Sequence, residues 1–549
     1  MPTATTRTEK SIRNACYALV GHLAGILAMF ACRTAFIRLL GAEYLGVSGL
    51  FGNVLSLISL AELGIGSAIL VSLYKPLAAG EEERIKALMH AYGIAYRVIA
   101  LVVFALGMLL CPFLDVLMKD EPAVPALTLV YSLYVLDAAQ SYCCSFKILL
   151  VEADQNGHIV NLYDTGFLIG QNLLQIALLW VTRDFVLYMG IQAGVTLVRN
   201  VVLSRKADRM YPCLRTLGGS RLVPAERRRI VRNVGAMLSH EVGNVVVNGT
   251  DNLLISRFVG VVWVGLYANY LLVVSTLQGI LGRVLGAVTA GIGNLNATET
   301  GDKPHRVFKT LLFLNFWLYG FCSVCLVVLF SPFIRLWAGP GYLLDEGITV
   351  IIVLNFYMGG MRTAGLAFRD TLGLFWNDRF KPVAEAAINL AASILLLARF
   401  GIAGVLWGTL ISTVATSFWV EPLILYRRAF HKPLRGYFAQ YAAYFAATLL
   451  AAAATWSLAR RMPFSGFGEL VGKGVLCLVV PNLVFLALFF RTEAFRQVMV
   501  IAGRYAGRIR SRGRGSLPVA ADTRTPGRTE QGDAPRGTGA SGGKIPEPP

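Results

Sequence analysis

Charged residues are scarce in this chain: of its 549 residues only 15% are Asp, Glu, Lys or Arg, whereas 55% are hydrophobic. Soluble globular proteins carry about 25% charged residues, so this composition excludes a soluble enzyme. The mean hydropathy of +0.59 likewise excludes a disordered chain. Histidine is also rare, with six residues that do not cluster, and no GxSxG, HExxH or Walker loop is present. We therefore predict neither an enzyme nor a metal site.

Long apolar runs are what the sequence has in abundance. A membrane-spanning helix needs about 20 apolar residues, and the runs supply about fourteen such spans. We expect an all-α, multi-pass protein of the bacterial inner (cytoplasmic) membrane. The predicted spans lie near residues 14–40, 46–74, 88–112, 124–150, 158–181, 185–204, 232–258, 262–292, 308–337, 347–375, 382–402, 404–427, 437–459 and 470–490.

The excess of basic over acidic residues lies next to these spans. Lys and Arg number 51 against 32 Asp and Glu, a net charge of +19, and the basic residues are dense at 205–232 and 491–549. Basic residues beside spans mark the cytoplasmic side and face anionic lipid headgroups. We therefore expect no nucleic-acid partner, and we predict that the N- and C-termini are both cytoplasmic.

An internal repeat is visible when the chain is shifted by 219 residues. The shift superimposes Arg38 on Arg257, Gly41 on Gly260 and Gly46 on Gly265. Six predicted spans separate the copies, so both copies run in the same direction across the membrane, a transporter signature. We predict two six-helix lobes and two extra C-terminal helices. The expected parts are an N-terminal lobe at 1–204, a basic cytoplasmic linker at 205–231, a C-terminal lobe at 232–430, helices 13 and 14 at 431–490, and a basic disordered tail at 491–549.

Arginines inside the predicted spans are the first candidate site residues. An ionised group at bilayer depth costs at least about 2.5–3.5 kcal/mol, so it should face a partner or a water-filled cavity. Acids near Arg33, Arg283 and Arg362 are too few and too scattered to pair each of them, which favours a cationic cavity. Hydrogen bonding between helices remains the alternative for the other polar residues of the spans. A guanidinium suits an anionic headgroup because it binds phosphate through two hydrogen bonds.

Two sequence blocks resemble a known family. The first runs from Arg38-Leu-Leu-Gly-Ala-Glu-Tyr-Leu-Gly46 through Leu60-Ala-Glu-Leu-Gly-Ile-Gly66 to Leu73-Tyr-Lys-Pro76, and the second joins Thr250-Asp-Asn-Leu-Leu-Ile-Ser256 to Val264-Gly-Leu-Tyr-Ala-Asn-Tyr270. Both resemble bacterial polysaccharide flippases, the polysaccharide transporter family of the multidrug/oligosaccharidyl-lipid/polysaccharide (MOP) exporter superfamily. The resemblance covers roughly residues 10–490. It implies a flippase that moves undecaprenyl-pyrophosphate-linked oligosaccharide across the cytoplasmic membrane for surface polysaccharide biosynthesis.

The resemblance also implies alternating access between the lobes. The lipid pyrophosphate would then meet Arg33, Arg283 and Arg362 in a cavity open to the cytoplasm. Glu62, Glu241 and Asp251 are candidates for coupling to protons or sodium, with a structural role as the alternative for Glu62. No cofactor is expected beyond such an ion, and a polysaccharide polymerase and glycosyltransferases are candidate partners.

Two other classes of function remain open. A drug or metabolite exporter of the same superfamily would use the same lobes around a more aromatic and acidic cavity. A membrane glycosyltransferase or polysaccharide polymerase would place catalytic residues in a long outer loop, and the predicted outer loops are all short.

Overall fold

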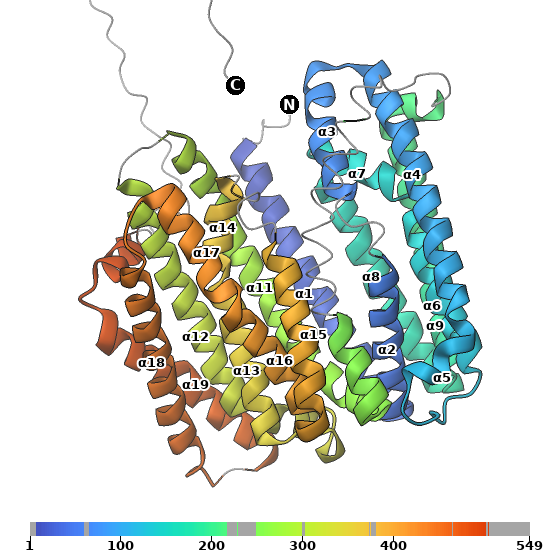
Figure 1. Cartoon of the computed structure of the whole chain (residues 1–549). Coiled ribbons are helices and arrows are strands. Elements are labelled where there is room, and N and C mark those ends of the chain that lie inside the picture. The colour runs from blue at the N-terminus through green and yellow to red at the C-terminus, as the bar shows by residue number, and fades with distance from the viewer. Residues whose placement is uncertain are drawn as a thin grey trace, which may run out of the picture. The chain divides into compact units, whose positions relative to one another are not determined.

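The structure, a computed structural model, describes residues 7–59, 65–216, 249–298, 302–372, 380–463 and 465–500, with the isolated positions 228, 374 and 503. Every regular element in these ranges is a helix (Figure 1), which confirms the all-α prediction. The helices named below belong to one compact unit, Met1–Arg496. The second unit, Gln497–Pro549, lies almost wholly outside the described residues.

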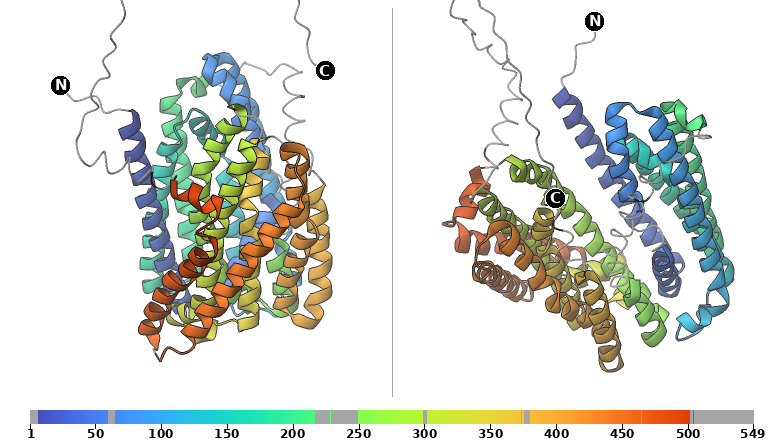
Figure 2. Two further views of the ribbon diagram at one scale, coloured as in Figure 1. Left: turned by 90° about the vertical axis from the view of Figure 1, so that its left-hand side faces the viewer. Right: turned by 45° about the horizontal axis from the view of Figure 1, so that its top comes forward.

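Helices up to residue 210 form the first group. In the tilted view of Figure 2 this group lies apart from the helices that follow it in the chain. Two of its predicted spans, 46–74 and 124–150, are each built from two shorter helices. The group consists of α1 (Arg7–Leu39), α2 (Ala42–Ile58), α3 (Ile65–Ala79), α4 (Glu82–Leu109), α5 (Leu114–Leu117), α6 (Leu127–Tyr142), α7 (Ser145–Ala153), α8 (Gly157–Thr182) and α9 (Phe185–Met210).

The second group starts near residue 249 and includes two π-helical turns, η4 (Ile255–Val259) and η7 (Tyr426–Phe430). Its α-helices are α11 (Val261–Thr298), α12 (Lys303–Trp337), α13 (Glu346–Met361), α14 (Thr363–Thr371), α15 (Lys381–Phe400), α16 (Ile402–Ala415), α17 (Ser417–Leu425), α18 (Arg435–Ala459) and α19 (Gly466–Phe489). The predicted helices 13 and 14 correspond to α18 and α19. They pack against α12, where Phe316 stacks on Tyr444 with ring centroids 4.2 Å apart.

Eleven helical segments in the described part of the chain are long and apolar enough to cross a membrane. Fourteen spans were predicted, and three of them are not among these eleven segments. The spans 46–74 and 124–150 are divided into shorter helices, and 232–258 lies mostly outside the described residues.

The internal repeat is visible in the backbone where α2 meets α11, the extensive contact that joins the two groups. Gly41 and Gly260, which the 219-residue shift superimposes, both have a positive φ, 95° and 134°. Each glycine N–H also donates to the carbonyl five residues earlier, Phe36 and Ile255 respectively. Only glycine adopts such a φ without strain, so both copies turn in the same way into the next helix.

The contact itself is reciprocal. A Cβ added to Gly46 would overlap the carbonyl oxygen of Val261, and a Cβ added to Gly265 would overlap that of Ala42. The shift of 219 residues superimposes Ala42 on Val261 and Gly46 on Gly265. Each copy therefore offers the same patch to the other, as expected for two repeats related by a two-fold axis.

Candidate functional site

A cavity of about 400 Å³ lies between the N-terminal helices and α11, and we call it the central cavity. Four helices from both groups line it: α1, α8, α9 and α11. Arg33 is the only charged residue among the described residues that line it. The full lining is Met29, Cys32, Arg33, Asn172, Tyr188, Ala268, Leu271, Leu272, Val274, Ser275 and Gln278.

The guanidinium of Arg33 is held by neutral groups. Its Nε donates to Oδ1 of Asn269 on α11, at 3.4 Å, and no ion pair to Arg33 is found in the part of the chain that the structure describes. Beside it, Tyr188 packs against Phe36 of α1 and its hydroxyl lies 3.8 Å from Sγ of Cys32. A half-buried cation that has no carboxylate partner among the described residues, in a cavity lined otherwise by neutral groups, has the chemistry to attract an anion.

Arg283 lies farther along α11. It is exposed, and it is eight residues beyond Ser275, about 12 Å of helix rise towards the predicted cytoplasmic end. Its charge acts on His22 of α1, as expected if α1 and α11 run antiparallel past each other. Arg283 is therefore on the helix pair that carries Arg33, but it does not line the central cavity itself.

Arg362 is placed differently, and the expectation that it lacks acidic partners is wrong. It sits at the break between α13 and α14, where its Nη2 lies 2.7 Å and its Nε 3.2 Å from the two carboxylate oxygens of Glu421. Its Nη1 lies 3.4 Å from Glu385, and Lys381 also pairs with Glu421. Two acids and two bases thus form a buried cluster within the C-terminal group, away from Arg33.

Glu385 and Glu421 are the residues that the sequence reasoning missed. Both are nearly inaccessible, and both stand in apolar helices, α15 and α17, 36 residues apart in the chain. In the sequence, the only sign that Glu385 and Glu421 are important is that each is an acidic residue within an apolar run. It could not be connected to Arg362, because the pairing depends on how three helices pack.

Asp251 belongs to a buried polar cluster, separate from the central cavity. Its Oδ2 accepts a hydrogen bond from Thr409 Oγ1 of α16 at 3.1 Å, and Asn389 Nδ2 of α15 donates to the same hydroxyl at 3.1 Å. Among the described residues, the Oδ1 atoms of Asp251, Asn252 and Asn389 are buried and have no hydrogen-bond partner. Buried acceptors of this kind call for a proton, a water or a cation. Glu62 and Glu241, the other two coupling candidates, lie outside the described residues.

Contacts between the two groups concentrate at one end of the helices. Trp337 Nε1 donates to Thr34 Oγ1 at 2.7 Å, and Arg257 Nη1 donates to the carbonyl of Met118 at 3.1 Å. The reciprocal contact of α2 with α11 lies at this same end. The predicted orientation places this end outside, so the groups are closed against each other on that side.

Comparison with solved structures places the fold. The chain superimposes on the lipid II flippase MurJ in an inward closed conformation, with a TM-score of 0.63 and 13% identity, over 86% of this chain and 99% of that one. An inward-facing multidrug transporter of the MATE family and MOP superfamily matches at a TM-score of 0.49 and 15% identity, over 74% and 96% of the two chains. The first of these two likenesses shows that the chain shares the fold of the MurJ structure. Another match is the MATE multidrug transporter DinF-BH, with a TM-score of 0.49 and 16% identity, over 75% of this chain and 93% of that one. No protein-family model and no curated protein matches the sequence.

Proposed function

We propose that this protein is a flippase of the MOP exporter superfamily that translocates undecaprenyl-pyrophosphate-linked oligosaccharide across the bacterial cytoplasmic membrane. The observation that carries the proposal is Arg33, a cation held by an amide in a cavity whose other described lining residues are uncharged. A fixed guanidinium binds phosphate through two hydrogen bonds and keeps its charge at any cellular pH. The likeness to MurJ, a flippase of lipid II, supports the same substrate class.

In the proposed cycle the groups stay closed at the outer end while the pyrophosphate enters from the cytoplasmic side. Arg283 meets the anion first, because it is exposed towards that end of α11, and Arg33 then holds it in the central cavity. The oligosaccharide occupies the space between the groups, and the prenyl chain stays in the lipid. Rocking of the groups then closes the cytoplasmic end and separates them at the α2–α11 contact, which opens the outer side.

We assign ion coupling to the buried polar cluster of Asp251. A proton or Na⁺ bound to Asp251 would satisfy its buried Oδ1, which lacks a donor among the described residues. Because Asp251 precedes η4 and is linked through Thr409 of α16 to Asn389 of α15, binding there would alter how these helices pack. The surface polysaccharide polymerase and glycosyltransferases remain candidate partners, since they would consume and supply such a substrate.

The test is translocation by the purified protein in proteoliposomes. A fluorescent undecaprenyl-pyrophosphate oligosaccharide in one leaflet should become accessible to a membrane-impermeant quencher faster with the protein than without it. A cationic dye should not be transported. Dye transport without lipid translocation would contradict the proposal and identify a drug exporter, the second candidate. Release of a covalently altered sugar would instead identify the glycosyltransferase or polymerase alternative.

A further inference from the structure

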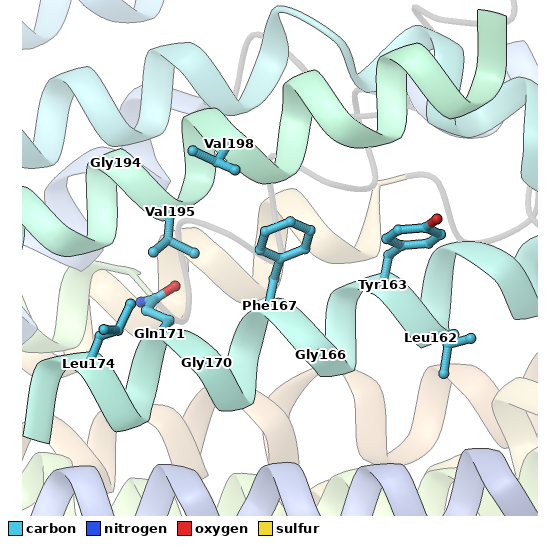
Figure 3. A pocket seen from close by; sticks show the side chains of 10 residues that line it. All are labelled: Leu162, Tyr163, Gly166, Phe167, Gly170, Gln171, Leu174, Gly194, Val195 and Val198. Atoms are coloured by element: carbon cyan, nitrogen blue, oxygen red, sulfur yellow. The ribbon is translucent and has the colours of Figure 1, made fainter. Parts of the chain in front are cut away.

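A second hollow of the molecule lies in the N-terminal group, outside the central cavity. It is an apolar groove of about 650 Å³ between α8 and α9, within the range of about 300–1,000 Å³ typical of ligand sites. All its described lining residues belong to these two helices. Figure 3 shows Tyr163 and Phe167 of α8 and Val195 of α9 bordering the space between the helices.

Glycine residues, which have no side chain, leave the space of this groove empty. Gly166 and Gly170 of α8 and Gly194 of α9 line it, and a Cβ added at any of them would meet no atom within 4 Å. Glycines at this spacing usually let two helices approach closely. Here they are not in close packing with another described helix, and the space above them is open.

The groove faces away from the transport path. Thr165 and Leu168 of α8 contact Gly21 and Gly25 of α1, and Asn172 lines the central cavity. At about 3.6 residues per turn, the groove-lining glycines fall on the opposite side of α8. In a membrane-spanning helix pair, that outer side is exposed to lipid.

Basic residues continue the groove at one end. Val195 and Val198 of α9 lie on the same helix face as Arg205 and Arg209, which follow at intervals of about two and three turns. Both arginines are exposed. An apolar groove that ends in two exposed guanidinium groups at the end of a span matches a lipid with an acyl chain and an anionic phosphate.

We propose that the α8–α9 groove binds an anionic phospholipid of the leaflet that contains the end of α9. One acyl chain lies along the glycines, and the phosphate contacts Arg205 and Arg209. The site is separate from the central cavity and from the flipped substrate. A second copy of the chain is the other candidate occupant, but it would leave the two arginines without a matching charge.

The experiment compares bound lipids on the full-length protein by native mass spectrometry. The probes are phosphatidylglycerol and phosphatidylcholine with identical chains. The wild type should retain phosphatidylglycerol preferentially. In Arg205→Gln/Arg209→Gln the preference should fall by about fivefold for each arginine, as expected from about 1 kcal/mol per basic residue. A wild type that binds both lipids equally would overturn the assignment of the phosphate to these arginines.

Filling the groove tests the chain-binding half of the proposal. Gly194→Leu places a side chain in the groove at a position where an added Cβ meets nothing within 4 Å, and it should abolish retention of the lipid. The matched control is Gly190→Leu, one turn earlier on α9, where a Cβ also meets nothing within 4 Å but which does not line the groove. Phosphatidylglycerol with a photoreactive acyl chain should label residues 162–174 in the control and not in Gly194→Leu.

Equal retention and labelling in the two glycine variants would overturn the proposal. So would a dimer, detected by cross-linking, that Gly194→Leu dissociates while leaving lipid retention unchanged. Translocation of the lipid-linked oligosaccharide is measured on the same samples. Because the groove is outside the transport path, the result of the lipid-retention experiment does not depend on whether the protein translocates the lipid-linked oligosaccharide.

Discussion

Single side chains show two ways of keeping a cation inside this protein. Arg33 is held by the amide of Asn269, whereas Arg362 is held by two carboxylates, those of Glu421 and Glu385. A guanidinium bonded by a neutral amide keeps its net charge available to a ligand. A guanidinium paired with two acids has its charge compensated already, so the two arginines should respond differently to the same substitution.

Replacing Arg33 tests its proposed role in holding pyrophosphate. Arg33→Gln removes a charged hydrogen-bond donor worth about 1.5–3 kcal/mol, so translocation should fall by about 10- to 100-fold. Arg33→Lys keeps the charge but loses the planar fork and should be partly active. Rates are measured by quencher accessibility in proteoliposomes. A stable Arg33→Gln/Arg283→Gln protein that translocates at the normal rate would rule out the cationic cavity.

Replacing Arg362 should instead destabilise the folded protein. Arg362→Gln leaves Glu421 and Glu385 buried with less compensation, and breaking a buried pair costs about 3–5 kcal/mol. We expect a large drop in melting temperature, measured by thermal denaturation in detergent. Arg362→Gln/Glu421→Gln should recover part of the loss because it removes both charges. If Arg362→Gln is fully stable and only translocation is lost, Arg362 is a substrate ligand after all.

Asp251 is the residue through which we expect ion coupling. Asp251→Asn keeps the shape of the side chain but removes the charge that a proton or Na⁺ would neutralise. Translocation by the wild type should accelerate under an imposed proton or sodium gradient, and translocation by Asp251→Asn should not. Glu346→Gln, an exposed acid at the start of α13, is the control. A gradient response that survives in Asp251→Asn would exclude this carboxylate from coupling.

From the sequence, it was easier to predict which residues carry a buried charge than to predict which residues bind them. Arg33 could be recognised because a charge within an apolar span must be accommodated somewhere. Its amide partner Asn269 is 236 residues away, and the Arg362 partners come from two other helices. Such pairings depend on helix packing, which has no signal in local sequence spacing.

At the scale of helices, glycine decides where the two halves meet. The backbone contact at Gly46 and Gly265 leaves no space for any side chain, so it fixes the separation of α2 and α11. In contrast, Gly52 of α2 has open space around it. Two glycine positions within one helix therefore differ in whether they tolerate a larger side chain.

A side chain at the contact should force the outer ends of the halves apart. Gly46→Leu would clash with Val261, so it should shift the protein towards the outward-open state. Spin-label distances between the ends of α2 and α11 should increase relative to Gly52→Leu, the control. Unchanged distances in a folded Gly46→Leu protein would show that the outer closure does not depend on this contact.

Helix positions were largely predictable, but their interruptions were not. The apolar runs gave the approximate extents of α8, α9, α12 and α19, since hydropathy alone sets a span. The breaks at Cys143–Cys144 and at Arg362 divide helices within continuous apolar stretches. No glycine or proline stands at the first break, and the glycine pair before the second, Gly359 and Gly360, lies within α13. Tertiary packing therefore decides where these helices end.

At the scale of the whole chain, the fold and the charge distribution lead to one arrangement in the membrane. Both termini should be cytoplasmic, with the reciprocal α2–α11 contact outside. A cysteine at Ser465, between α18 and α19, should react with an impermeant maleimide added to intact cells. A cysteine at Gly218, which lies outside the described residues, should not react. Labelling at Gly218 in intact cells would reverse the orientation.

The reciprocal glycine contact also says something about ancestry. An interface in which each partner presents the same patch is the interface of a symmetric homodimer. Two unlinked six-helix polypeptides lying parallel in the membrane could have associated through this surface before a gene duplication fused them. The present chain carries the constraint that such a contact imposes. Neither Gly46 nor Gly265 can be replaced by a larger residue on its own, because the main chain of the other copy occupies the volume that any new side chain would need.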